Sequence, residues 1–314
     1  MAKKSSKMNP FVLSAVAAVL VIGIIVLANS GIGLDFTKEE AYSISPEGVL
    51  SYGARVPLKM FNESVISDNQ RFISKKVVFE SHGANIYGLY IRPKVNGKIE
   101  GKIPAAVILP GAGVTKEEEA QLPNDLNDLG IATFVIDQRG VGETDGELPS
   151  LKEDYLLFLE GNETYSHKMV YDALRAFDYL AMQKDIDPSK LLMAGESFGG
   201  RNAIIATAIE PKVFGILVVG TAGLNAVTAQ SENLLRFLKS IDPDNYIARI
   251  SPRKIVMIHS KGDTFVPIGA SMATFDKAKE PKSFIAANYT GHGYASEKMR
   301  PSLEKELIEW MLEK

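Results

Sequence analysis

The sequence predicts an α/β fold, in which a central, mostly parallel sheet has helices on both faces and follows one transmembrane helix. Strand-like and helix-like segments alternate from about residue 103 to the C-terminus. The later strand-like segments are apolar throughout, which is typical of parallel strands buried on both faces. Near the N-terminus, residues 11–28 form a charge-free apolar segment with the length of a membrane span.

The composition excludes several classes of function. The net charge is −3 and no basic stripe occurs, so we expect no nucleic-acid partner. The chain has no cysteine, which excludes disulfides, thiolate metal sites and cysteine nucleophiles. No motif calls for a cofactor or a metal ion, and none is predicted.

Residues 11–28 are predicted to anchor the chain in a lipid bilayer. As a helix they would be about 27 Å long at ~1.5 Å per residue, close to the ~30 Å hydrocarbon core. Lys3, Lys4 and Lys7 precede this span within a short basic tail, residues 1–10. The positive-inside rule keeps this tail in the cytoplasm and sends the rest of the chain across the membrane.

A cleaved signal peptide is the alternative for the same segment, and it would release a secreted protein. Small residues near position 28 resemble a cleavage site, but a signal peptide's apolar part is usually only ~7–15 residues. In either case residues 29–74 are expected to be a juxtamembrane spacer, and residues 75–314 the folded domain.

Within that domain the elements follow in a regular order. The patterns predict a hairpin around His82-Gly83, then strands and helices in alternation. The expected strands lie in the segments 103–113, 131–144, 190–195, 213–221, 254–263 and 282–293, and the expected helices at 116–129, 167–183, 201–210 and 302–314.

The stretch MAGESFGGR, Met193 to Arg201, places one serine among three glycines. The G-x-S-x-G pattern is weak alone, but here an apolar strand precedes it and a helix follows it, which is the required context. A strand that reverses into a helix strains the backbone at Ser197, and larger residues at Gly195 and Gly199 would clash. The turn lifts the hydroxyl toward the positive end of the helix, so Ser197 is predicted to be a nucleophile.

A serine nucleophile needs a base, and the chain has four histidines. His82 lies in the hairpin turn, His167 begins a helix, and His259 lies within a strand, where a structural hydrogen bond is expected. His292, in NYTGHGY, combines a loop after a strand with flexible glycine neighbours. It is therefore the predicted base.

The histidine in turn needs a carboxylate, which fixes its tautomer and stabilises its cation. The acidic residues between Ser197 and His292 are Glu210, Glu232, Asp242, Asp244, Asp263, Asp276 and Glu280. Asp263, in HSKGDTFVP, is the one that directly follows an apolar strand. The order Ser197, Asp263, His292 is the order described for the α/β-hydrolase fold.

The chain from about Lys75 to its end resembles an α/β hydrolase. The motifs LPGAG, DQRGVGET, DPSKLLMAGESFGG, IHSKGDTFVP and GHGY match in order. The chain is similar to the dienelactone-hydrolase-like and prolyl-peptidase-like branches, in which a D-P-x-K-L strand leads into G-x-S-x-G-G. The resemblance implies Ser197 as nucleophile, Asp263 as acid and His292 as base.

The resemblance also implies an oxyanion hole made of two backbone N–H groups, those of Phe198 and Ala112. Many family members have a histidine where this chain has Pro110, which leaves the identity of the second donor open. A phosphate loop is the alternative for DQRGVGET, but this stretch lacks the P-loop lysine and follows the wrong strand for a dinucleotide fingerprint. The resemblance implies a structural turn there.

These residues predict a membrane-anchored serine hydrolase that cleaves carboxylic esters through an acyl-enzyme. A serine peptidase or a thioesterase is the alternative, with a small ester or a short peptide as substrate. A non-catalytic binding protein on a hydrolase fold is a second alternative, against which the complete triad argues. Residues 145–165 and 221–249 are expected to shape a pocket, the latter as a small cap over the serine or by ordinary packing.

Overall fold

The computed structural model describes residues 42–56, 58, 60–148, 150–225 and 231–312. The predicted basic tail and membrane span, residues 1–28, lie outside these ranges. Within the described residues, no helix combines the length and the apolar character needed to cross a bilayer.

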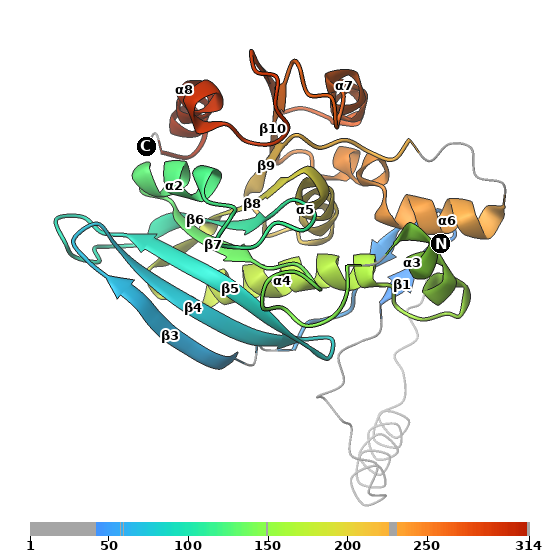
Figure 1. Ribbon diagram of the computed structural model, residues 1–314, viewed down its shortest axis with the longest axis horizontal. Coiled ribbons are helices and arrows are strands. Elements are labelled where there is room, and N and C mark those ends of the chain that lie inside the picture. The colour runs from blue at the N-terminus through green and yellow to red at the C-terminus, as the bar shows by residue number, and fades with distance from the viewer. Residues whose placement is uncertain (1–41, 57, 59, 149, 226–230, 313–314) are drawn as a thin grey trace, which may run out of the picture. The chain divides into compact units, whose positions relative to one another are not determined.

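A nine-stranded sheet organises the described residues (Figure 1). In spatial order it contains β11 (Lys282–Ala287), β10 (Lys254–Ser260), β9 (Gly215–Val219), β8 (Ile186–Glu196), β6 (Ile103–Leu109), β7 (Ala132–Ile136), β5 (Ala84–Pro93), β4 (Phe72–Ser81) and β3 (Met60–Asp68). The strands from β11 to β7 are parallel, and β5, β4 and β3 continue the sheet in antiparallel pairs. The predicted mostly parallel sheet is confirmed.

Helices cover both faces of the parallel strands, as predicted. On one face α4 (Tyr165–Met182) and α5 (Ser197–Ile209) form a buried apolar cluster with alternate strand residues such as Val107. On the other face α2 (Gln121–Asp128) and α8 (Ser296–Leu307) pack on the intervening residues, such as Ile108. Because successive side chains of a strand point to opposite faces, an apolar strand contributes residues to both clusters.

Shorter elements complete the chain. They are the two-stranded pair β1 (Ser43–Ile44) and β2 (Leu50–Ser51), the helices α3 (Leu151–Leu159), α6 (Glu232–Ile241) and α7 (Ile268–Lys277), the 3₁₀ turns Pro243–Asn245 and Ile247–Arg249, and a π-helical turn at Ile308–Leu312. α3 begins with a capping box, in which Ser150 and Glu153 satisfy each other's backbone N–H groups.

The sheet starts earlier in the chain than Lys75. The predicted hairpin is present as β4 and β5, and its turn residues His82 and Gly83 have φ of 39° and 73°, as a tight two-residue turn requires. However, β3 and the first residues of β4 lie in the expected spacer 29–74 and belong to the sheet. β3 carries few apolar residues on an edge of the sheet, so it lacks the pattern of a buried strand.

Candidate active site

Ser197 lies at a sharp turn between β8 and α5, as the glycine pattern predicted. It is the first residue of α5 and has a φ of 51°, in the left-handed region that non-glycine residues rarely adopt. A Cβ at Gly195 would lie 2.6 Å from the carbonyl oxygen of Gly199, and a Cβ at Gly199 would overlap the carbonyls of Leu109 and Pro110. The close approach of β8, α5 and the end of β6 therefore requires glycine on both sides of the serine.

Asp263 and His292 are hydrogen-bonded partners. Nδ1 of His292 donates to Oδ2 of Asp263 at 2.7 Å, while Oδ1 accepts the backbone N–H groups of Phe265 and Val266, both at 2.9 Å. Burial raises the pKa of Asp263, but these hydrogen bonds outweigh it, so the pKa lies below the usual value. Asp263 is thus an ionised, fixed acceptor that leaves Nε2 of His292 free to take a proton from elsewhere.

The serine and the histidine both lie near the end of β9. The strands β8, β9, β10 and β11 are adjacent and parallel, so the loops that follow them open at one edge of the sheet. The Thr221 hydroxyl donates to the carbonyl oxygen of Ser197 at 2.7 Å. A Cβ at the preceding Gly220 would lie 3.4 Å from Cε1 of His292. The structure therefore brings Ser197, Asp263 and His292 together around one strand end.

The other histidines have structural surroundings. His259 shares a hydrogen bond of 2.8 Å with the carbonyl of Val266, as its position within a strand predicted. His82 stacks on Tyr171. His167 is fully buried against the Ser240 hydroxyl, and burial lowers its pKa to about 3, so it stays neutral.

The expected oxyanion donors are Phe198, directly after Ser197, and Ala112, which follows Gly111, where a Cβ would lie 3.9 Å from Cβ of Ser197. Phe198 belongs to the first turn of α5, where backbone N–H groups have no partner within the helix. Ala112 is exposed in the turn after β6. A feature not predicted from the sequence supports this turn: the Gln138 amide donates to the carbonyl of Pro110 at 2.6 Å and accepts from Asn202 at 2.8 Å. The oxyanion role of Phe198 and Ala112 stays a prediction.

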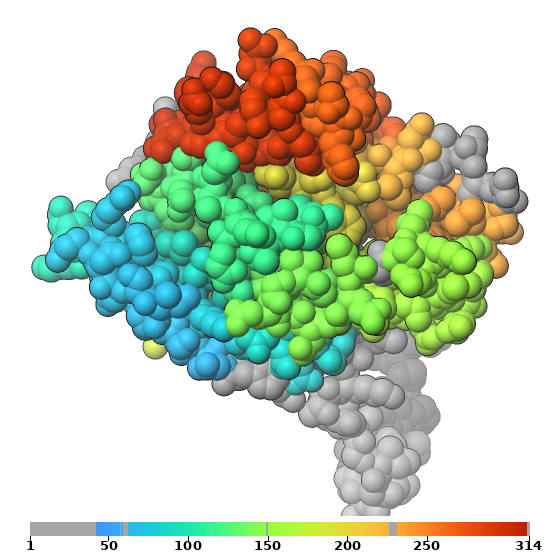
Figure 2. Space-filling view, viewed as in Figure 1, coloured from blue at the N-terminus to red at the C-terminus, as the bar shows by residue number. Residues whose placement is uncertain are grey.

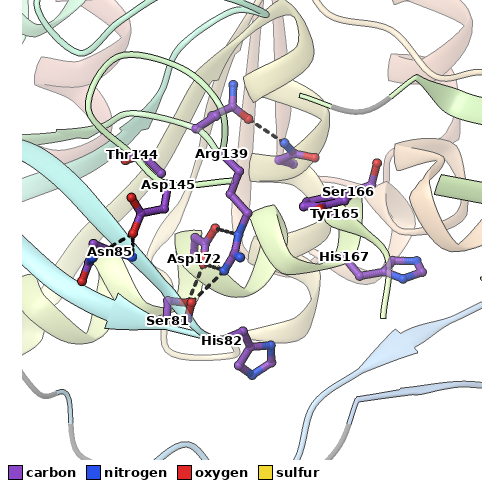
Figure 3. Close-up of polar contacts among 12 residues, drawn as sticks. Ser81, His82, Asn85, Arg139, Thr144, Asp145, Tyr165, Ser166, His167 and Asp172 are labelled. Atoms are coloured by element: carbon purple, nitrogen blue, oxygen red, sulfur yellow. Dashed lines mark hydrogen bonds and ion pairs between the residues drawn. The ribbon is translucent and has the colours of Figure 1, made fainter. Parts of the chain in front are cut away.

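The DQRGVGET loop is a turn held by hydrogen bonds within the loop and to neighbouring parts of the protein. Asp137 accepts from the backbone N–H and the ammonium of Lys116, both at 2.7 Å, and from the N–H of Glu143 at 3.0 Å. Figure 3 shows Arg139 of this loop converging with Ser81 and Asp172; its guanidinium donates to both oxygens of Asp172 at 2.7 and 2.8 Å. These contacts fasten the loop to α4 and to the β4–β5 hairpin.

A half-buried carboxylate connects the nucleophile's turn to the histidine's loop. Glu196, directly before Ser197, accepts the backbone N–H of Tyr294 at 2.8 Å. Burial raises the pKa of Glu196, and burial beside Glu196 raises that of Glu119 to about 8. Glu119 and Glu196 could not be identified from the sequence, because nothing near either residue in the chain shows that they are neighbours.

A cavity of about 230 Å³ is lined by Phe198, the residue that directly follows the serine. Both segments expected to shape a pocket contribute to it, and its lining is Leu151, Asp154, Ser166, Phe198, Arg201, Asn202, Leu224 and Ile241. The helices α3 and α6, which both contribute to the lining, pack together through Tyr155, Phe158 and Phe237, and Figure 2 shows the yellow-green α3 beside the orange α6. Among the described residues, no group of three or more His, Cys, Asp or Glu side chains is arranged to hold a metal ion.

Known proteins share this sequence pattern and fold. A model of the prolyl oligopeptidase family matches residues 123–314. The protein YfhR of Salmonella typhi, whose name calls it uncharacterized, is 25% identical over 217 residues, covering 65% of this chain and 68% of its own.

Solved structures agree on the architecture. The acetyl xylan esterase from Paenibacillus sp. R4 matches with a TM-score of 0.67 and 20% identity, over 82% of this chain and 90% of its own. Est1E from Butyrivibrio proteoclasticus, solved with ferulic acid bound, matches with a TM-score of 0.56 and 21% identity, over 75% of this chain and 98% of its own. The α/β-hydrolase fold is confirmed.

Proposed function

The chain belongs to the prolyl oligopeptidase family of serine hydrolases, and we propose that it cleaves carboxylic esters through an acyl-enzyme on Ser197. The observation that carries the proposal is the 2.7 Å hydrogen bond between His292 and Asp263 beside the strained turn of Ser197. A base with a fixed tautomer close to a serine hydroxyl is the arrangement that activates serine for attack on a carbonyl.

The mechanism proceeds in two halves. Oγ of Ser197 attacks the carbonyl carbon while Nε2 of His292 takes the hydroxyl proton, and Asp263 stabilises the resulting imidazolium. The N–H groups of Phe198 and Ala112 hold the oxyanion, each worth ~2.7–4 kcal/mol of barrier. The ester C–O bond then breaks, and His292 gives its proton to the leaving alkoxide. Water, deprotonated by His292, releases the acyl group in the same way.

An ester is the preferred substrate because the proteins that share the fold include an acetyl xylan esterase and an enzyme solved with ferulic acid. A peptide is the second candidate, since the family that matches the chain is named for oligopeptidases. The test uses purified protein with a series of 4-nitrophenyl esters, the matching thioesters and a peptide library. Cleavage of peptides with no turnover of esters would replace the ester proposal with the peptidase.

Covalent labelling separates an enzyme from a binding protein. A fluorophosphonate reacts only with an activated serine, so we expect it to modify Ser197 and to leave a Ser197→Ala protein unlabelled. An unlabelled wild-type protein that also hydrolyses nothing would favour a binding protein on this fold.

The location of the enzyme is a further part of the proposal. Residues 11–28 would anchor it in the membrane, with the domain outside the cytoplasm, supported by the charge-free span and the lysines ahead of it. We expect the protein in the membrane fraction and released by detergent but not by salt. Sequencing of the mature N-terminus decides between the alternatives, because a chain that begins near Asn29 or Gly31 would be a secreted product of signal-peptide cleavage.

A further inference from the structure

The cavity next to Phe198 is also lined by Arg201, whose hydrogen-bond donors are only partly satisfied by the described residues. Arg201 lies one helical turn after the serine, and Phe198, Arg201 and Asn202 share one face of α5 because they are three and four residues apart. Side chains on a helix lean toward its N-terminus, so Arg201 is directed toward the end that carries Ser197.

The hydrogen bonds of Arg201 leave donors available. Its Nε donates to the carbonyl of Ala222 at 2.9 Å, and among the described residues neither terminal nitrogen of the guanidinium has a hydrogen-bond partner. A guanidinium presents its donors as a planar fork that matches a carboxylate. Among the described residues, nothing in the cavity lining occupies the two terminal nitrogens of the half-buried Arg201.

The carboxylates near Arg201 do not fill that site. Burial lowers the pKa of Arg201, and Asp242 and Asp244 only partly offset this effect. Asp242 accepts the N–H of Leu224 at 3.0 Å, and Asp244 pairs with Lys277 at 2.5 Å. Neither forms an ion pair with Arg201 among the described residues.

Asp154 is the acidic group in the cavity lining. Both of its oxygens accept backbone N–H groups at the start of α4, from Tyr165 at 2.8 Å and from Ser166 at 3.0 Å. Its charge is thus directed at the positive end of a helix and away from the open donors. Three further lining residues, Leu151, Leu224 and Ile241, are apolar and suited to a short methylene chain.

We propose that Arg201 binds a carboxylate of the substrate, so that the enzyme selects esters that carry a carboxylate a few bonds from the scissile carbonyl. The inference rests on the proposed function and names its substrate class. Arg201 is four residues after Ser197 on α5, a rise of about 6 Å at ~1.5 Å per residue, so the carboxylate and the scissile carbonyl must lie close together in the substrate.

Two substrate pairs test the proposal on the full-length protein. The first pair is the 4-nitrophenyl monoester of glutaric acid and 4-nitrophenyl pentanoate, which differ in a carboxylate on the acyl side. The second is 4-carboxyphenyl acetate and 4-carbamoylphenyl acetate, which differ on the leaving-group side. We expect the charged member of one pair to have the higher kcat/KM, and the pair concerned identifies the side of the ester that faces Arg201.

Arg201→Gln should lower kcat/KM for that charged ester by ~10- to 100-fold, the range of a charged hydrogen-bonded contact, and leave its neutral partner within about threefold. Arg201→Lys should restore part of the preference. Arg253→Gln is the matched control, since Arg253 is also half-buried and donates to backbone carbonyls but does not line the cavity. A preference in neither pair, or one that survives Arg201→Gln, overturns the proposal.

Direct binding separates this inference from the proposed function. Glutarate should bind to the Ser197→Ala protein in a calorimetric titration, and the additional change Arg201→Gln should abolish the binding. If no ester is hydrolysed and no fluorophosphonate reacts, the esterase proposal fails while glutarate binding still tests Arg201. Absence of glutarate binding to a folded Ser197→Ala protein overturns the carboxylate site.

Discussion

Asp263 holds His292 from one oxygen while the backbone holds Asp263 from the other. Oδ2 accepts Nδ1–H of His292 at 2.7 Å, and Oδ1 accepts the N–H groups of the loop that follows β10. The carboxylate therefore cannot rotate without losing hydrogen bonds. The orientation of the imidazole follows from the fold of this loop.

Asp263→Asn should lower kcat by ~10⁴-fold with the fold intact, because an amide stabilises the wrong tautomer of His292. The measurement is the steady-state hydrolysis of a 4-nitrophenyl ester. Asp276→Asn, an exposed change in α7, is the control and should keep wild-type activity. A loss below tenfold in the Asp263 variant would remove this carboxylate from the mechanism.

Ser197→Ala should lower turnover by at least ~10⁴-fold, because triad residues act as a unit. Ser189→Ala is the matched control, since Ser189 is exposed and its hydroxyl contacts only the nearby Asp187. Both proteins should unfold at the same temperature as the wild type. Full hydrolysis by purified Ser197→Ala protein would show that another residue is the nucleophile.

Gly199→Ala should prevent formation of a stable folded protein, because the added Cβ would overlap the carbonyl oxygens at the end of β6. Gly269→Ala tests the same substitution in open space, in α7, where a Cβ meets nothing within 4 Å. It should leave the stability unchanged or raise it by ~0.5–1 kcal/mol. Denaturant unfolding measures both, and equal effects of the two changes would contradict the close packing around Ser197.

Glu119→Gln should stabilise the protein, and more so in mild alkali than in mild acid. Burial, and then the adjacent carboxylate of Glu196, raise the pKa of Glu119 from 4.5 to about 8. Between these pH values the folded protein holds a proton that the unfolded chain has lost, so stability falls as the pH rises through this window. The neutral amide of the variant would carry no such dependence, and unfolding at pH 5 and pH 8.5 measures the difference.

The control for this pH dependence is Glu309→Gln, a change at an exposed position. It should alter stability by the same small amount at both pH values. A Glu119→Gln protein whose gain is equal at pH 5 and pH 8.5 would show that Glu119 is ionised in the folded state at both.

The parallel strands were predictable because each is a continuous apolar segment, which is visible in the sequence without knowledge of its partners. β3 was not, since it is an edge strand with Val65 and Ile66 58% and 60% exposed and polar residues around them. α8 begins at Ser296, several residues before the predicted start at 302. The prediction placed the start after Pro301 because proline usually marks a helix boundary, but here the proline lies inside the helix.

The positions of Ser197, Asp263 and His292 could be predicted because each follows an apolar strand, and because their order along the chain is the one described for this fold. Contacts between distant parts of the chain could not. Gln138, which holds the Pro110 carbonyl, and Glu119, which faces Glu196, have partners that only the folded sheet reveals. The helical spacing of Phe198 and Arg201 is visible in the sequence. The cavity that both residues line is not, because α3 and α6 contribute part of its wall.

The arrangement of the site across β8, β9, β10 and β11 also makes hydrolysis a marker of when folding ends. The turn at Ser197 forms between β8 and α5 against the end of β6, whereas Asp263 and His292 arrive when β10 pairs with β9 and β11 with β10. Such non-local pairings form slowly, because the chain loses the entropy of closing a long loop before the new contacts stabilise it. During refolding, helical circular dichroism will therefore recover ahead of catalytic activity, and the interval between the two signals times the docking of the last two strands.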